Sequence, residues 1–221
     1  MVTAHTANYN DLAELTWNKN KKQYCERWGY DAIAKVDNFK YPPSQISFER
    51  TEVIIELLES GKCDWIHAVG CDTMITNFTI TLDSLVDEKS HFIIATNCLH
   101  INNDSFLARA TPECINWLKY VVSVREKYVD YVNAEGHRWF DQQAMIDSLD
   151  QINPWLKIVP QRVLNSHDYD QYPGAIPHIY KKDIFGNDGQ WQKGDFLIHW
   201  PAVPNPRRMI LAQSMLLQVI K

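Results

Sequence analysis

Apolar residues recur along the chain in two patterns, short continuous segments and longer stretches with helical spacing. The continuous segments are typical of buried strands and occupy residues 1–6, 32–36, 64–69, 91–96, 105–110, 156–163 and 195–200. The stretches with helical spacing occupy residues 11–28, 47–60, 112–129, 140–149 and 207–220. Because strands alternate with helices, the pattern predicts an α/β fold in which helices flank a mostly parallel central sheet.

Polar and small residues mark where these elements begin and end. Asp11 is placed to be the N-cap of the first helix, and Gly29 is placed to end it. Residues 165–193 are rich in Asp, Gly, Tyr and Pro and show little periodicity. We therefore expect a long surface loop there, of the kind that often forms a lid or a binding loop. The basic residues of the first helix are interpreted as a solvated face; they are Lys19, Lys21 and Lys22.

Composition favours a globular domain with a small-molecule partner. The 221 residues carry 22 Lys and Arg against 27 Asp and Glu, a net charge of -5, and no basic patch is evident. Nucleic acid is therefore not an expected partner. No apolar stretch approaches the ~18–20 residues of a membrane span, no signal peptide is visible, and the 5 cysteines form no CxxC pair. We expect one domain over residues 1–221, soluble and cytoplasmic, which could also be part of a longer chain.

Asp72 follows the apolar segment that is expected to form the central strand. In open α/β sheets, ligands bind beyond the carboxyl ends of the strands. A carboxylate there is well placed to hold a hard divalent cation against a diphosphate, and such a cation neutralises the charge that builds on a leaving phosphate. The alternative interpretation is that Asp72 and Thr73 simply begin a turn, which is common after a strand.

Two other residues are candidates for chemistry. His199 ends an apolar strand segment, where it could be a metal ligand through one ring nitrogen or a hydrogen-bonded core residue. Asp141 stands at the start of a predicted helix, where an acidic residue normally acts as a cap or a dipole partner. A catalytic role for Asp141 requires that it lie near the metal site, which the sequence cannot show.

Taken together, these segments resemble the GT-A-fold glycosyltransferases that include fungal α-mannosyl- and galactosyltransferases and plant xyloglucan xylosyltransferases. Residues 18–31 resemble the family's "KNK…YC…HGYD" helix and turn, residues 64–77 its strand ending in a DxD motif, and residues 101–109 its "LNTGSFLLRN" strand. Shorter matches are "DQ" at 141–142, "PQ…LN" at 160–165 and "GDF…H" at 194–199. The resemblance implies a single GT-A (Rossmann-like) domain.

The resemblance also implies roles for individual residues. Asp72 falls on the final Asp of DxD and His199 on the family's other protein metal ligand, so the two would bind Mn²⁺, with Mg²⁺ as the alternative cofactor. Asp141 and Gln142 fall on the segment that faces the anomeric carbon. The remaining donor-binding positions lie on the first strand, near the nucleotide and beside the donor sugar; they are Val2, Thr3, Ala4, Arg50, Asn102 and Asp104.

The chain departs from the family pattern at two positions. The first Asp of DxD is replaced by Gly70, so a carboxylate normally near the metal is absent. The Gly of "NTG" is replaced by Asp104, which adds a carboxylate and bulk where the donor sugar should lie. We expect either weaker metal binding or a site in which Asp72 suffices, and a donor preference that differs from the relatives.

The resemblance implies a metal-dependent, retaining transferase that moves a hexosyl or deoxyhexosyl unit from a UDP-sugar, glucose-like or rhamnose-like, to a glycan hydroxyl. The alternative, motivated by Gly70, is a catalytically weakened domain that binds a nucleotide sugar or a glycan. A more distant likeness is to the N-terminal glycosyltransferase domain of multidomain proteins that algal viruses encode, which would place the enzyme in the host cytoplasm.

Overall fold

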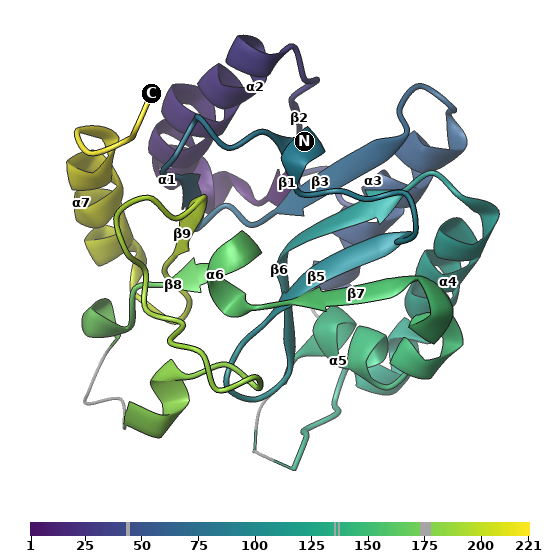
Figure 1. The fold of residues 1–221 in the computed structure, drawn as a ribbon. Coiled ribbons are helices and arrows are strands. Elements are labelled where there is room, and N and C mark those ends of the chain that lie inside the picture. The colour runs from purple at the N-terminus through teal and green to yellow at the C-terminus, as the bar shows by residue number, and fades with distance from the viewer. Residues whose placement is uncertain (43–44, 135, 137, 173–177) are drawn as a thin grey trace.

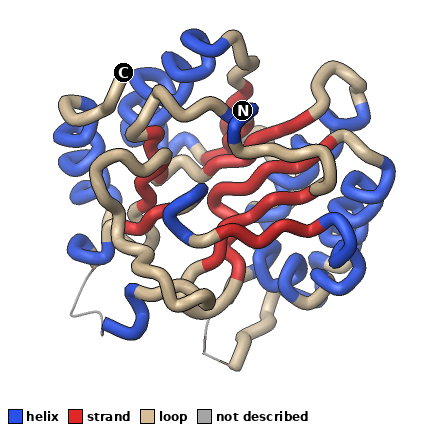
Figure 2. Tube along the Cα trace, in the orientation of Figure 1, coloured by secondary structure: helices blue, strands red, loops and turns tan. Residues whose placement is uncertain are grey.

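The fold is described from a computed structural model, which defines residues 1–42, 45–134, 136, 138–172 and 178–221. In this part of the chain a six-stranded sheet lies between two layers of helices, and a smaller sheet packs beside it (Figures 1 and 2). The predicted α/β class with a mostly parallel central sheet is confirmed. Among the described residues, no helix is long and apolar enough to cross a membrane.

The central sheet has the strand order β2-β1-β3-β6-β5-β7. The strands are β1 (Val2–His5), β2 (Ile33–Val36), β3 (Trp65–Val69), β5 (Phe92–Thr96), β6 (Ile101–Arg109) and β7 (Leu156–Val159). Neighbouring strands are parallel except where β6 runs antiparallel to β3 and to β5. The parallel strands β1 and β3 therefore end at the same edge of the sheet, where the following turns can build a ligand site.

Helices cover both faces of this sheet. The helices α3 (Ser47–Glu59), α4 (Pro112–Ser123) and α5 (Phe140–Ile146) pack on one face. The other face is covered by the N-terminal helix, which consists of α1 (Asn10–Ala13), a π-helical segment (Glu14–Lys21) and α2 (Lys22–Trp28). Phe92 and Ile94 of β5 enter the first core cluster, whereas Ile93 and Ala95 enter the second. A strand buried on both faces explains the continuous apolar run in the sequence.

The smaller sheet brings together segments that are distant in sequence. It has the order β4-β9-β8, formed by β4 (Thr73–Ile75), β9 (Leu197–His199) and β8 (Ser166–His167). The helices α6 (Gln161–Leu164) and α7 (Asn205–Leu216) follow β7 and β9 along the chain. Met74, Ile198 and Trp200 share a core cluster with residues of α1 and α7. This packing fixes the antiparallel register in which Thr73 faces His199.

Several predicted boundaries were wrong. The strand predicted for residues 156–163 ends at Val159, because Pro160 has no backbone N–H for the ladder and α6 begins directly after it. The strand predicted from residue 105 begins at Ile101. Asp11 lies in the first turn of α1 rather than at its N-cap, whereas Gly29 ends the helix with a φ of 75°, as predicted.

The expected loop at residues 165–193 also contains regular structure. Residues 173–177 of it lie outside the described part of the chain. The rest includes β8 and short 3₁₀ turns, among them Tyr169–Gln171. Strand β8 pairs with β9 for two residues only, Ser166 with Ile198 and His167 with His199. A two-residue strand leaves no periodic signal, so the sequence pattern could not reveal it.

Candidate functional site

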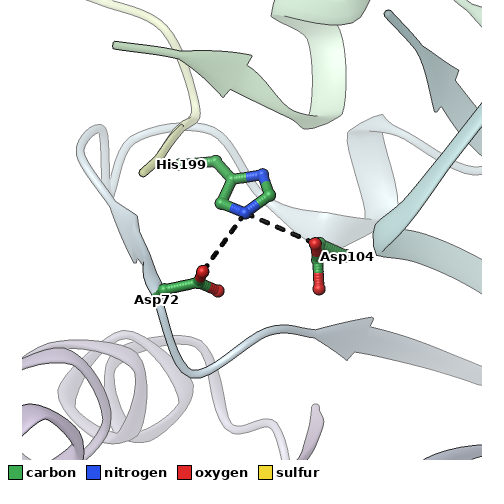
Figure 3. A group of neighbouring side chains, drawn as sticks. All are labelled: Asp72, Asp104 and His199. Atoms are coloured by element: carbon green, nitrogen blue, oxygen red, sulfur yellow. Dashed lines mark ion pairs between the residues drawn. The ribbon is translucent and has the colours of Figure 1, made fainter. Parts of the chain in front are cut away.

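Three side chains from three different strand segments converge near the edge where β1 and β3 finish (Figure 3). They are Asp72 before β4, Asp104 in β6 and His199 at the end of β9. The Nε2 atom of His199 lies 3.6 Å from Oδ2 of Asp72 and 3.4 Å from Oδ2 of Asp104. One ligand atom from each residue lies within 4.8 Å of the other two. Two carboxylates and an imidazole offer oxygen and nitrogen donors that suit a hard or borderline divalent cation.

His199 is the most constrained member of this group. Its side chain is fully buried, and neither of its ring nitrogens makes a hydrogen bond with a residue that the structure describes. Its ring packs edge-on against His167 at 4.9 Å, and the Nδ1 atom of His167 is 2.8 Å from the Tyr172 hydroxyl. Burial lowers the pKa of His167 well below its ordinary value, so that ring is neutral. Because buried polar atoms are nearly always paired, the free Nε2 of His199, directed at two carboxylates, indicates a ligand-binding role.

Asp72 is also held by an arginine of α7. The Nη2 atom of Arg208 lies 2.7 Å from Oδ2 of Asp72, and its Nε donates to the backbone oxygen of Trp200. Burial by itself would raise the pKa of Asp72, but His199 and Arg208 outweigh it and hold that pKa well below the ordinary value. Asp72 is thus an anion that lies between a guanidinium group and an imidazole.

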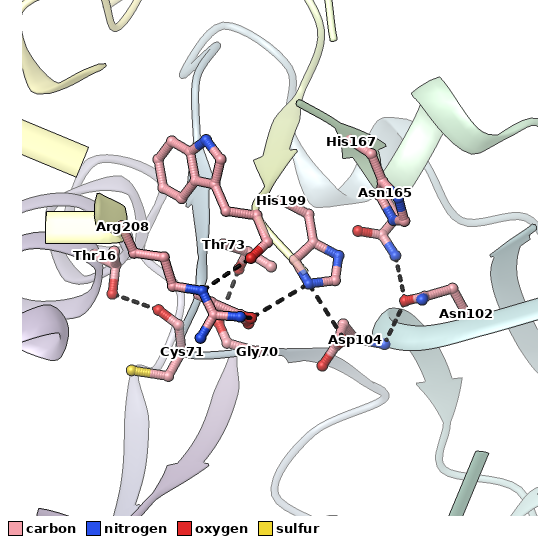
Figure 4. Close-up of polar contacts among 12 residues, drawn as sticks. Thr16, Gly70, Cys71, Thr73, Asn102, Asp104, Asn165, His167, His199 and Arg208 are labelled. Carbon is pink, nitrogen blue, oxygen red and sulfur yellow. Dashed lines mark hydrogen bonds and ion pairs between the residues drawn. The ribbon is translucent and has the colours of Figure 1, made fainter. Parts of the chain in front are cut away.

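The turn that carries Asp72 is anchored to the N-terminal helix. The Nζ atom of Lys21 donates to the backbone oxygens of Gly70 at 2.9 Å and Thr73 at 2.5 Å. The Thr16 hydroxyl donates to the oxygen of Cys71 at 2.7 Å, as Figure 4 shows. These donors come from the π-helical segment, a form of helix that is frequent at functional sites. The solvated face predicted for Lys21 was therefore wrong: this side chain is fully buried because the turn supplies carbonyl partners for its ammonium group.

Asn20 extends the same anchor to β4. Its side-chain amide donates to the backbone oxygen of Ile75 at 2.9 Å and accepts from the backbone N–H of Ile75 at 2.8 Å. A side chain thus fills both hydrogen-bonding positions of one residue of β4, as a neighbouring strand would. The helix therefore holds β4 on one side while β9 holds it on the other.

Asp104 is fixed on β6 by neighbouring amides and an arginine of α3. Its backbone N–H donates to Oδ1 of Asn102, and the Asn165 side chain donates to the same oxygen at 2.6 Å. The Nη1 atom of Arg50 lies 3.7 Å from Oδ1 of Asp104, while its Nη2 donates to the backbone oxygen of Asn103 at 2.6 Å. One carboxylate oxygen of Asp104 therefore faces His199 and the other faces Arg50.

Asp141 and Gln142 lie at the start of α5, next to the same stretch of β6. The Asn103 side chain donates to Oδ2 of Asp141 at 2.8 Å, and its backbone N–H donates to Oε1 of Gln142 at 3.2 Å. Burial raises the pKa of Asp141 to about 6, with the Asp104 charge adding to the rise and Arg50 opposing it. Gln142 holds the β6 backbone, whereas Asp141 is a carboxylate that changes charge near neutrality.

A cavity of about 400 Å³ joins these residues. Five predicted residues line it, namely Ala4, Arg50, Asp72, Asp104 and Asp141, together with Arg208. The other two first-strand candidates, Val2 and Thr3, are 1% exposed and do not line it. Asn102 and Gln142 act on the β6 backbone instead. His199 is not among the residues that line the cavity, but its ring is directed at Asp72 and Asp104 (Figure 3).

Sequence reasoning missed Arg208 and Asn103 as members of the site. Arg208 falls on the buried face of α7 with Ala212 and Met215, at spacings of four and three residues. A lone arginine on an apolar helix face is a signal that could have identified it. Asn103 carries no such signal, because its partners belong to α3 and α5.

Comparisons with known proteins identify glycosyltransferases as similar in sequence and in fold. Residues 1–90 match the sequence model of the galactosyl transferase GMA12/MNN10 family. The fold is similar to that of a glycosyltransferase involved in the glycosylation of the major capsid of PBCV-1, with a TM-score of 0.74 at 14% identity over 96% of this chain and 97% of that one. No curated protein sequence matches the chain.

Two further solved structures are similar in fold. The galactosyltransferase LgtC, in complex with donor and acceptor sugar analogs, matches with a TM-score of 0.55 at 11% identity, over 96% of this chain and 95% of that one. GlyE of Streptococcus pneumoniae TIGR4 matches with a TM-score of 0.58 at 13% identity, over 98% of this chain and 60% of that one. At such identities the structures establish the fold, and the family match adds the class of enzyme. The chain is a glycosyltransferase with the GT-A fold, and its residues 1–90 are similar to the galactosyl transferase GMA12/MNN10 family.

Proposed function

We propose that this enzyme transfers a hexosyl or deoxyhexosyl unit from a UDP-sugar to a glycan hydroxyl, with a divalent cation bound by Asp72 and His199. Mn²⁺ is the first candidate because the donor set combines carboxylate oxygen with imidazole nitrogen. The observation that carries the proposal is the buried, unpaired Nε2 of His199 facing Asp72 beside an open cavity. A core histidine would have a hydrogen-bond partner, whereas a metal ligand keeps one nitrogen free.

The charges around the cavity support a diphosphate ligand. A bound cation would neutralise the charge that develops on the departing diphosphate. Arg208 and Arg50 line the cavity next to Asp72 and Asp104 respectively, and both are fixed by backbone carbonyls. Guanidinium groups held in place bind phosphate oxygens without a large loss of side-chain entropy. The cavity volume of about 400 Å³ is in the range of small-ligand sites.

Asp141 is the candidate for the group nearest the reacting carbon. It lines the cavity, and its carboxylate is oriented by Asn103. A carboxylate there could stabilise the positive charge that develops on the sugar during transfer, or act as a nucleophile in a reaction with retention of configuration. Both roles require the ionised form, which its pKa of about 6 supplies at neutral pH.

The proposal is tested by following UDP release from UDP-glucose and UDP-rhamnose with Mn²⁺ or with EDTA. We expect release by the unmodified enzyme with Mn²⁺, and a loss of at least about 100-fold in Asp72→Ala and His199→Ala, because each change removes a ligand. Asp150→Ala, at an exposed position, is the matched control. Turnover that stays the same in both site variants would show that the metal site is wrong. Binding of UDP-sugar without any release would favour the nucleotide-sugar binding module instead.

A further inference from the structure

Gly70 and Asp104, the two departures from the family pattern, lie face to face. Gly70 follows β3, and its N–H donates to the backbone oxygen of Asp104 at 2.7 Å. A Cβ atom built on Gly70 would lie 2.9 Å from Oδ1 of Asp104 and 2.9 Å from Oδ1 of Asp72. Contacts that short are not found between real Cβ atoms and their neighbours, so something would have to move. The Asp104 carboxylate therefore occupies the space into which a side chain at position 70 would project.

We propose that Asp104 supplies the metal-site carboxylate that the first Asp of a DxD motif would supply, so that this acidic group has moved from the turn after β3 to strand β6. The inference rests on the proposed metal-dependent function and specifies its ligand set as Asp72, Asp104 and His199. Asp104 adds an oxygen 3.4 Å from the unpaired Nε2 of His199, closer than the 3.6 Å of Asp72. The site keeps two carboxylates although the sequence motif keeps one.

The surrounding contacts hold Asp104 in this position. Asn102 and Asn165 form a chain of side-chain hydrogen bonds that ends on the Asp104 backbone N–H, as Figure 4 shows. The β3–β6 pairing places Val69 opposite Ser105, so residues 70 and 104 are the next opposed positions. Relative to the family pattern, position 70 has lost an aspartate and the opposed position 104 has gained one. The carboxylate at position 104 therefore lies in nearly the same place as one at position 70 would.

The competing explanation is that Asp104 only neutralises Arg50. Oδ1 of Asp104 is 3.7 Å from Nη1 of Arg50, a weaker approach than the 2.6 Å bond from Arg50 to the Asn103 backbone. The two explanations predict different effects of removing the Asp104 carboxylate. A carboxylate that serves only Arg50 has no influence on cation binding, whereas a ligand carboxylate binds the cation at least as well when Arg50 is gone, because a competing positive charge has been removed.

The experiment measures Mn²⁺ affinity, with and without UDP, from the electron paramagnetic resonance signal of free Mn²⁺. Asp104→Asn should weaken binding by about 10-fold or more. In the absence of UDP, where Arg50 has no phosphate to bind, Arg50→Gln should not weaken it, and the exposed control Asp150→Asn should not weaken it under either condition. Gly70→Asp alone should also impair binding, because its side chain meets the carboxylates of Asp104 and Asp72. The exchanged pair Gly70→Asp with Asp104→Gly should restore affinity to within a few-fold of the unmodified protein.

The outcomes separate this inference from the proposed function. Unchanged affinity in Asp104→Asn, with affinity lost in Asp72→Asn, would overturn the relocation and leave the metal-dependent function standing. Weak binding in Asp104→Asn that the exchanged pair fails to restore would also overturn it, provided that circular dichroism shows the pair folded. An unmodified protein that binds no Mn²⁺ even with UDP would remove the proposed metal dependence itself.

Discussion

Replacing Lys21 by methionine keeps the length of the side chain but removes the charged donor beneath the turn that carries Asp72. The Lys21 ammonium now satisfies the backbone oxygens of Gly70 and Thr73. Gly70 would keep one partner, since the Thr73 hydroxyl also donates to its oxygen at 2.8 Å. Leaving buried carbonyl groups with fewer partners costs about 1–3 kcal/mol. For a domain of this size, such a loss lowers Tm by roughly 2–12 °C.

Thermal unfolding at pH 7 and Mn²⁺ titration are the assays for Lys21→Met. The matched control is Lys22→Met, because Lys22 is the next residue of the same helix and is exposed. We expect the Lys21 variant to unfold at a lower temperature and to bind Mn²⁺ more weakly, since the turn no longer fixes Asp72. The same Tm and Mn²⁺ affinity in both lysine variants would refute the anchoring role of Lys21.

The pH dependence provides an independent check of the same reasoning. Burial lowers the pKa of Lys21 from 10.5 to about 8, with Cys71, Asp72 and Asp104 opposing the change. Between these values the unfolded chain binds more protons at Lys21 than the folded protein does, so the stability of the unmodified protein should rise with pH in this window. The stability difference between the unmodified protein and Lys21→Met should therefore increase from pH 8 to pH 10.5. A difference that stays constant would contradict burial of a charged lysine.

Four further predictions concern the cavity. Arg208→Gln should weaken UDP binding about 10-fold but strengthen Mn²⁺ binding in the absence of UDP, because the substitution removes the positive charge beside Asp72. Calorimetry that finds both affinities reduced would contradict this prediction. The acidic limb of the UDP-release profile should have its midpoint near pH 6, the pKa of Asp141, and Asp141→Asn should lack that midpoint. The pKa of Asp141 in the folded protein exceeds its ordinary value of 3.8, so the folded protein holds a proton that the unfolded chain has lost. As pH rises from 4 to 6, the unmodified protein should therefore lose up to about 3 kcal/mol of stability relative to Asp141→Asn. Denaturation at several pH values measures this difference. UDP with Mn²⁺ should raise Tm by several degrees and EDTA should abolish the rise, whereas an equal rise with UDP alone would argue against a shared site.

The α/β class and most helices could be predicted from the sequence because burial imposes periodicity. Strand β5 is buried on both faces and reads as a continuous apolar run, whereas α4 buries one face and shows helical spacing. Elements whose position depends on tertiary partners left no such signal. Strand β8 is two residues long, and α6 exists because Pro160 ends β7.

Some residues of the candidate site could be predicted from the sequence and others could not. Motif spacing was enough to single out Asp72, His199 and Asp141, since each follows or begins a recognisable element. It was not enough for Lys21, which lies among exposed lysines in sequence, because only the packed turn supplies the carbonyl oxygens that its ammonium needs.

The sequence by itself therefore determined the class of fold, the family resemblance and the residues of the DxD-like turn. Only the tertiary structure decided that Gly70 and Asp104 occupy one space, because their relation depends on the antiparallel register of β3 and β6. The tertiary structure likewise decided that His199 faces Asp72. The two residues are far apart in the sequence, and the pairing of β4 with β9 brings them together. Sequence spacing records which residues are available, whereas strand register and packing decide which of them meet.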